Sequence, residues 1–240
     1  MNQALSDKLS SYKPSQSAID LIKKTPILLL VGPTGAGKDA LKDRLLQTNQ
    51  YHHLVSHTTR PPRINHGVLE QDGLEYHFMD LKKAERMLDE HGFVEAKMYS
   101  GNIYGTSVAE IQVAHDESKV ALTDIEVQGV KEFKAFDEAV MAIFLLPPDF
   151  ATWQARLQRR YGDVVDAADS RLRLQTALDE LEQLLNTDHY LPIINDDINA
   201  ALDEVQAYVT TRQVDPDLEA KAHATAQMLA DDIRNYLETH

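Results

Sequence analysis

A short glycine-rich segment, Gly32-Pro-Thr-Gly-Ala-Gly-Lys38, combines the residue types that bind phosphate groups. Its glycines let the backbone curve closely around an anion, so that successive amide N–H groups point at the same oxygen atoms. Lys38 adds a positive charge for the β- and γ-phosphates of a nucleoside triphosphate. An apolar run at 26–31 precedes the segment and a helical pattern at 40–47 follows it. This order favours a phosphate-binding loop over a glycine-rich turn without a ligand, because a helix N-terminus also attracts anions.

The residue after the lysine departs from the usual form of this loop, which has Ser or Thr there as a Mg²⁺ ligand. This chain has Asp39 instead. We interpret Asp39 as a carboxylate ligand of Mg²⁺; a helix-start residue favoured by the helix dipole and a sign of reduced activity are the alternatives. Asp124, at the end of the apolar run 120–125, is the second predicted Mg²⁺ ligand, with a strand-end turn cap as its alternative. The residues expected to contact ATP in this loop are Gly32, Pro33, Thr34, Gly35, Ala36, Gly37, Lys38, Asp39 and Ala40.

Three further segments carry groups suited to a second, phosphorylated substrate. The first is 56–63, followed by Glu70 and Tyr76; the second joins Glu95 to 100–106; the third is 124–129. Arginine forks match phosphate geometry in charge-assisted hydrogen bonds. These segments therefore carry groups that can bind a second, phosphorylated substrate.

In this order and spacing, the segments resemble the guanylate kinase family of P-loop nucleoside monophosphate kinases from about residue 26 to 211. The resemblance implies transfer of the γ-phosphate of ATP to GMP, with Mg²⁺ as the cofactor of ATP. It implies a GMP site made of Ser56, Arg60, Arg63, Glu70, Tyr76, Glu95, Tyr104, Thr106 and Glu126. Glu126 stands where the family has aspartate, so that its side chain is one methylene longer.

Four arginines form a basic cluster in an acidic chain: Arg156, Arg159, Arg160 and Arg171. Arginines on a helix face paired with nearby carboxylates are the simpler interpretation. The resemblance implies instead that Arg160 and Arg171 belong to a mobile lid, and that Arg156 and Asn195 contact ATP. Positioning and neutralisation of charge carry most of the rate in phosphoryl transfer. The residues expected to act on the transferred phosphate are Lys38, Arg60, Arg160 and Arg171.

The elements that must hold these groups alternate between buried strands and helices. Strands are expected at 26–32, 120–125, 140–146 and 190–195, with helices at 81–91, 150–160 and 167–186. Pro192 favours an edge position for the last strand. The alternation predicts an α/β fold with a mostly parallel sheet, which the resemblance extends to a three-layer P-loop fold with a small GMP-binding insertion and a helical lid.

The resemblance divides the chain further. The expected parts are an N-terminal arm with a short helix at 1–25, a kinase-like domain at 26–211, and a C-terminal helical extension at 212–240. Within the domain, the expected subdivisions are core at 26–55, 107–150 and 176–211, a GMP-binding insertion at 56–106 and a lid at 151–175. The extension has apolar residues at helical spacing, which predicts a helix packed on its own domain; a homodimer contact is the alternative.

Composition limits the classes of partner. The 240 residues include 24 basic and 38 acidic side chains, a formal net charge of −14, which argues against a nucleic-acid binder. The chain has no cysteine, which fits a reducing compartment, and no apolar run of membrane-spanning length. A cytoplasmic location is therefore expected, and the resemblance implies an enzyme with ATP and GMP as substrates. A ribose 1,5-bisphosphokinase, a relative in which Gly-Lys-Asp occurs in the phosphate loop, and a non-catalytic guanylate kinase-like binding module are the alternatives.

Overall fold

The computed structural model describes residues 3–65, 67–161 and 167–239. Two compact units make up the chain. Unit 1 comprises Met1–Ile27, Gln50–Thr123 and Ala135–Ala139, and unit 2 comprises Leu28–Asn49, Asp124–Lys134 and Val140–His240. These boundaries differ from the predicted ones. The segment Gln50–Thr123 places the expected insertion at 56–106 in one unit with residues on both sides of it, and the expected lid lies in the same unit as the phosphate loop.

Unit 2 contains a parallel sheet in the order β11-β10-β1. Its strands are β1 (Ile27–Val31), β10 (Met141–Leu146) and β11 (Leu191–Ile194). All five residues of β1 and all six of β10 are buried, as expected for strands covered on both faces. Pro192 lies in the edge strand β11, as its missing N–H predicts. The prediction of an α/β fold with a mostly parallel sheet is thus confirmed.

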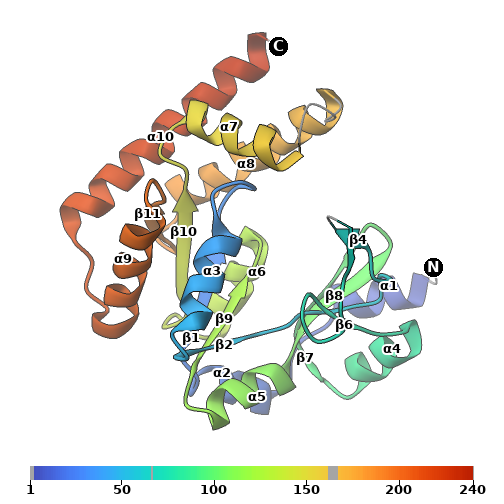
Figure 1. Cartoon of the computed structure of the whole chain (residues 1–240). Helices are drawn as coiled ribbons and strands as arrows, with labels where there is room; N and C mark the ends of the chain where they lie inside the picture. Colours follow the sequence, from blue (N-terminus) through green and yellow to red (C-terminus); the bar gives the residue numbers. More distant parts are fainter. Residues whose placement is uncertain (1–2, 66, 162–166, 240) are drawn as a thin grey trace. The chain divides into compact units, whose positions relative to one another are not determined.

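Helices flank these strands. They are α3 (Lys38–Gln47), α6 (Val127–Phe136), α7 (Phe150–Tyr161), α8 (Ala167–Leu185), α9 (Ile198–Thr211) and α10 (Pro216–Thr239). α3 packs against α9, and α10 runs alongside α8 and β11 (Figure 1). The face that α10 buries in its own unit includes Ala222, Ala226, Leu229 and Ile233. No helix in the described part of the chain has the length and apolar character of a membrane span.

Unit 1 is built on a sheet in the order β6-β3-β8-β7. The strands are β3 (His57–Thr58), β6 (His77–Phe78), β7 (Phe93–Tyr99) and β8 (Asn102–Ser107). Ser100 and Gly101 join β7 to β8 with φ values of 46° and 80°, the positive pair that a tight two-residue hairpin turn requires. The short strands β4 (Ile64–Asn65) and β5 (Val68–Leu69) form a separate hairpin.

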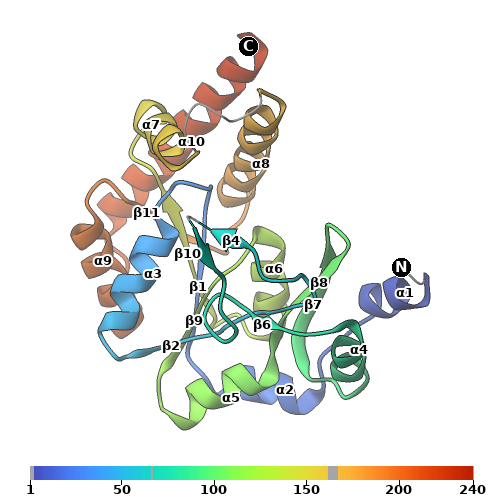
Figure 2. The ribbon, with the colours of Figure 1, turned by 45° about the vertical axis from the view of Figure 1, so that its right-hand side comes forward.

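A second group of elements completes unit 1. β2 (Tyr51–His53) pairs in parallel with β9 (Val120–Asp124). The helices are α1 (Gln3–Ser10), α2 (Gln16–Ile22), α4 (Leu81–Asp89) and α5 (Val108–Asp116). Asp80 and Ser107 cap the N-termini of α4 and α5 by accepting backbone hydrogen bonds. α1 and α4 lie beside the β7–β8 hairpin (Figure 2).

The N-terminal region differs from the expected arm. Residues 3–10 form α1, and Leu5 and Leu9 are buried with Phe93 and Leu88 in one hydrophobic cluster. The Tyr12 hydroxyl donates to the Phe93 carbonyl oxygen at 2.7 Å. Two leucines spaced by four residues are too short a pattern to predict a helix from sequence, and their burial is decided by the apolar face that unit 1 offers them.

His57 is a buried histidine of unit 1 whose pKa predicts a pH-dependent stability. It is 8% exposed, and burial, aided by His77 and Lys83, lowers its pKa from 6.5 to about 4. The unfolded chain therefore binds a proton below pH 6.5 that the folded chain excludes, so stability falls as the pH falls through this window. We expect His57 alone to lower the free energy of unfolding by about 2 kcal/mol between about pH 8 and about pH 5.

His57→Phe provides the comparison, since a phenyl ring can keep the edge-on contact of His57 with Phe93, whose ring centroids are 6.0 Å apart. Urea unfolding at both pH values measures the change for each protein. The loss of stability should be smaller in the variant by the amount assigned to His57. An equal loss in both proteins would mean that His57 is protonated in the folded state as readily as in the unfolded one.

Candidate active site

The glycine-rich loop follows β1 directly and leads into α3 in unit 2. All three of its glycines have a positive φ, and at two of them a side chain would also collide with neighbouring atoms. Gly32 has a φ of +130°, and a Cβ there would lie 2.3 Å from the Leu145 carbonyl oxygen. Gly37 has a φ of +103°, and its Cβ would lie 2.2 Å from Nδ2 of Asn195. Any other residue at either position would push the loop away from its neighbours.

Side chains behind the loop hold its backbone in place. Asn195 Nδ2 donates to the Ala36 carbonyl oxygen at 2.8 Å, and Trp153 Nε1 donates to that of Thr34 at 2.7 Å. Arg156 Nη2 donates to the Asn195 carbonyl oxygen at 2.9 Å. The two predicted ATP contacts outside the loop, Arg156 and Asn195, thus brace it in this structure. Arg156 Nη1 is buried without a hydrogen-bond partner in the described part of the chain.

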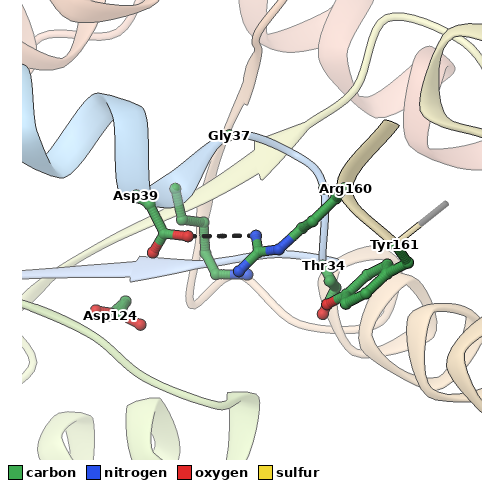
Figure 3. Close-up of a pocket in the computed structure, with 8 residues that line it drawn as sticks. Thr34, Gly37, Asp39, Asp124, Arg160 and Tyr161 are labelled. Carbon is green, nitrogen blue, oxygen red and sulfur yellow. Dashed lines mark hydrogen bonds and ion pairs between the residues drawn. The ribbon is translucent and has the colours of Figure 1, made fainter. Parts of the chain in front are cut away.

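A pocket of about 190 Å³ opens at the loop, within unit 2. Its lining residues are Thr34, Gly35, Gly37, Lys38, Asp39, Asp124, Arg160 and Tyr161 (Figure 3). Lys38 Nζ donates to the carbonyl oxygen of Gly32. The pKa of Lys38 is lowered overall, because the effect of burial exceeds the opposing effect of the carboxylates of Glu180, Asp124 and Asp39. The pocket therefore combines loop glycines, two cations and two carboxylates in one small volume.

Both carboxylates of the pocket are paired with cations. Asp39 and Arg160 point toward one another, with Oδ2 and Nη1 3.3 Å apart (Figure 3). Asp124 Oδ1 accepts from Lys42 Nζ at 2.5 Å. Burial alone would raise the pKa of Asp124, but Lys42 and, more weakly, Lys38 bring it below its ordinary value. Asp124 is therefore held in its ionised form, as a metal ligand must be.

The donor set fits Mg²⁺ bound together with a nucleotide. Carboxylate oxygens are hard ligands, and Mg²⁺ is commonly held by one or two of them, with waters and substrate phosphates completing the shell. Asp39, from α3, and Asp124, from the end of β9, both line the pocket. Among the described residues, no group of three or more His, Cys, Asp or Glu side chains is arranged to hold a metal. The protein thus offers part of a coordination shell, and phosphate oxygens would have to supply more.

Three residues near the pocket are not predicted by the sequence motifs: Lys42, Arg173 and Glu180. Arg173 Cζ lies 4.1 Å from the ring centroid of Tyr161, a pocket residue. The pKa of Glu180 is raised to about 7, chiefly by burial. The carboxylates of Glu126 and Asp179 also raise it, while Lys38 acts in the opposite direction. Their spacing along the helices was the sequence signal that could have placed these three residues on the faces that meet the pocket. Lys42 is one turn after Lys38, and Arg173 and Glu180 are four residues before and three after the buried Ala177.

The predicted lid arginines lie differently. Arg160, at the end of α7, reaches the pocket, while Arg171 is exposed on α8. Part of the predicted lid, residues 162–166, lies outside the described residues. In the described part, the arginine of α8 that contacts a pocket residue is Arg173, since α8 buries Leu174 and Ala177 and turns position 171 to solvent.

Unit 1 contains most of the predicted GMP residues. Arg60 is 6% exposed, and its Nη1 and Nη2 donate to the two carboxylate oxygens of Glu70 at 2.8 and 3.0 Å. The Arg63 amide also donates to Glu70 Oε2 at 2.8 Å. The hydrogen bond to Glu70 is the main cause that raises the pKa of Arg60, with Tyr104 contributing. Glu70 therefore fixes the orientation of the Arg60 guanidinium.

The other predicted GMP residues lie on the same sheet or beside it. Glu95 Oε1 accepts from the Thr106 amide at 3.0 Å and from the Thr106 hydroxyl at 2.9 Å. The rings of Tyr76 and Tyr104 meet edge to face at 5.8 Å, and Arg60 Cζ is 5.2 Å from the Tyr76 centroid. Ser56 is half-buried before β3.

Two residues of the predicted GMP set stand apart from this group. The Arg63 side chain is exposed, and Glu126 is exposed and belongs to unit 2. Unit 1 thus brings together an arginine fixed by a carboxylate, two tyrosines and a carboxylate fixed by a threonine. An arginine and two tyrosines suit a phosphate, and Glu95 suits a base with paired donors.

Known proteins resemble this chain over most of its length. The guanylate kinase family model matches residues 23–212. A guanylate kinase of Schizosaccharomyces pombe is 35% identical over 194 residues, covering 80% of this chain and 93% of the relative. One of Chromohalobacter salexigens is 38% identical over 188 residues, covering 78% and 83%. The crystal structure of guanylate kinase from Anaplasma phagocytophilum shares the fold, with a TM-score of 0.58 at 24% identity over 87% of this chain and 94% of that one. Because the family model spans residues 23–212 and these two relatives are 35% and 38% identical over most of their length, this chain belongs to the guanylate kinase family.

Proposed function

We propose that the chain transfers the γ-phosphate of ATP to GMP and forms ADP and GDP. The pocket at the phosphate loop carries the proposal: glycine backbone, Lys38 and Arg160 line it together with the carboxylates Asp39 and Asp124. This is the set of groups that phosphoryl transfer requires, namely amides and cations for phosphate oxygens and hard ligands for a metal. Membership of the guanylate kinase family makes GMP the acceptor to test first.

At the ATP end, the loop amides and Lys38 would bind the β- and γ-phosphates. Asp39 and Asp124 would hold Mg²⁺, which when bound with ATP supplies neutralisation of phosphate charge. Arg160 is 3.3 Å from Asp39 and would exchange that carboxylate for a phosphate oxygen, since a guanidinium forms strong hydrogen bonds with either. Arg156 and Asn195 keep their predicted contacts with ATP on the strength of the motif, and in this structure they brace the loop. Arg171 keeps its predicted lid role, with Arg173 as the candidate that contacts the pocket residue Tyr161.

At the GMP end, Arg60 would bind the phosphate, with Arg63, Tyr76 and Tyr104 as further donors. Glu70 holds both nitrogens of the Arg60 fork and so presents the guanidinium in one orientation. Glu95, fixed by Thr106, would accept from guanine N1–H and the exocyclic amine. Ser56 and Glu126 stay in the proposed base site on the strength of the motif alone.

A coupled ADP-release assay with ATP and Mg²⁺ tests the proposal against its alternatives. GMP, dGMP, AMP, UMP and ribose 1,5-bisphosphate are compared as acceptors. Turnover selective for GMP supports the proposal. Turnover with the sugar bisphosphate alone would move the chain to the bisphosphokinase reaction, and no turnover with any acceptor would favour a binding module.

Asp39→Ser should retain the Mg²⁺-dependent activity within about threefold or raise it, because a hydroxyl is the usual metal ligand at this position. The exposed pair with Arg160 that it removes stabilises the protein by only about 0.2–1 kcal/mol. Steady-state kinetics at varied Mg²⁺ measure the effect. Asp43→Ser, on the exposed side of α3, is the matched control. Complete loss of activity in Asp39→Ser alone would mean that this carboxylate has another role.

Three further expectations stay predictions from the sequence. The lack of cysteine fits a cytoplasmic location, and the acidic composition fits substrates rather than nucleic acid as partners. Light scattering of the purified protein decides between a monomer and the alternative of a homodimer formed through the C-terminal helix.

A further inference from the structure

Two ion pairs involve the pocket carboxylates, and the pair between Lys42 and Asp124 is less exposed than the pair between Arg160 and Asp39. The Lys42 side chain is 15% exposed and that of Asp124 37%, against 48% and 60% for Arg160 and Asp39. Lys42 Nζ lies 2.5 Å from Asp124 Oδ1, and the two residues are 82 positions apart in the chain. Because water screens a sheltered pair less, this ion pair holds its partners more firmly than the Asp39–Arg160 pair does.

Lys42 approaches Asp124 from outside the pocket lining. Lys38, one turn earlier on α3, lines the pocket, whereas Lys42 is not one of the lining residues. A ligand in the pocket can therefore contact the Asp124 carboxylate while the ammonium of Lys42 stays beside it. The charge of Lys42 acts on whatever binds to Asp124.

That charge opposes a bare divalent cation. A cation that binds Asp124 comes within a few ångströms of the Lys42 ammonium, and like charges at that separation repel strongly in a partly buried site. In the described part of the chain, no cluster of three or more acidic or histidine side chains offsets this repulsion. The phosphates of a nucleotide would offset it, since they bring several negative charges into the pocket.

We infer that Lys42 is a positioning residue whose ammonium offsets the charge of the ionised Asp124 carboxylate in the nucleotide-free protein. The metal ion then binds as a complex with the nucleotide and not alone. The inference rests on the proposed function, because it takes the pocket as the metal–nucleotide site. Lys42 thereby makes Asp124 available as a ligand only when phosphate is present, which keeps the phosphate loop from being occupied by free divalent cations.

Binding of Mn²⁺, followed by its electron paramagnetic resonance signal, tests the inference without turnover. Mn²⁺ is titrated into the full chain alone and in the presence of ADP. In the wild type, Mn²⁺ alone should bind weakly and ADP should strengthen its binding. In Lys42→Met, the Kd of Mn²⁺ alone should fall about tenfold or more, as expected for removal of one nearby like charge, and the strengthening by ADP should shrink.

Matched variants separate charge from structure. Lys42→Gln keeps a hydrogen-bond donor beside Asp124 without the charge, and it should behave like Lys42→Met even if the latter folds poorly. Lys42→Arg should behave like the wild type. Lys42→Met combined with Asp124→Asn should lose the gain in affinity, and Lys24→Met, at an exposed position, should show none.

Each outcome decides the inference. An unchanged or weaker affinity for Mn²⁺ alone in both Lys42→Met and Lys42→Gln would overturn it, as would persistence of the gain in the double variant. If the wild type binds Mn²⁺ no better with ADP than without, the proposed nucleotide site itself fails and the inference fails with it. Turnover with GMP in the ADP-release assay distinguishes these two failures.

Discussion

Lys38→Ala should lower kcat for transfer to GMP by about a thousandfold, the magnitude associated with loss of a positioned group that stabilises charge in a transition state. The Lys38 ammonium lines the phosphate pocket and is tethered by the Gly32 carbonyl oxygen, so it sits where a transferring phosphoryl group would be bound. Alanine at this position keeps the helix. The ADP-release assay measures the rate, and circular dichroism checks the fold.

The specificity of this effect can be tested with a second lysine. Lys24→Ala removes the same charge from an exposed position before β1 and should leave the rate unchanged. The affinity for GMP, measured by calorimetry without ATP, should also be unchanged in Lys38→Ala, since its predicted site is built from other residues. Turnover close to that of the wild type in Lys38→Ala would exclude the phosphate loop from the mechanism.

Glu95→Gln should raise the KM for GMP by about a hundredfold while changing the KM for ATP little, because a guanine donor would face an amide donor in place of a carboxylate oxygen. The substitution can preserve the hydrogen bonds that hold this side chain. Glu95 Oε1 accepts from the Thr106 amide and hydroxyl, and a glutamine oxygen can keep both bonds while its NH₂ takes the other position. The fold should therefore be unaffected.

Discrimination between bases gives a second readout for Glu95. An amide offers one donor and one acceptor, which suits adenine better than guanine, so the preference of Glu95→Gln for GMP over AMP should narrow. Glu90→Gln, at the exposed end of α4, is the control for loss of a negative charge and should keep the preference. Equal effects of Glu95→Gln on ATP and GMP would count against its role in recognising the base.

The apolar strands of the parallel sheet were predictable because their signals are local, whereas strands β2 to β8 were not predicted from the sequence pattern. Apolar runs over 26–32, 140–146 and 190–195 became β1, β10 and β11 with boundaries within a few residues. Helix α1 could not be predicted, because Leu5 and Leu9 are buried only by a surface that Phe93 and Leu88 help to form. Short apolar patterns depend on such distant partners, whereas long ones do not.

The sequence by itself determined the phosphate loop, since the glycines and Lys38 are contiguous, and the family, since its motifs keep their order along the chain. Only the tertiary structure decided the partners of the charged side chains. Asp39 meets Arg160 across 121 residues, and Asp124 meets Lys42 across 82. The raised pKa of Glu180 likewise follows from burial, with the nearby carboxylates of Glu126 and Asp179 adding to it and Lys38 opposing it. Electrostatic energy depends on distance and solvent exposure, and for residues so far apart in the chain both are set by the packing of the folded protein.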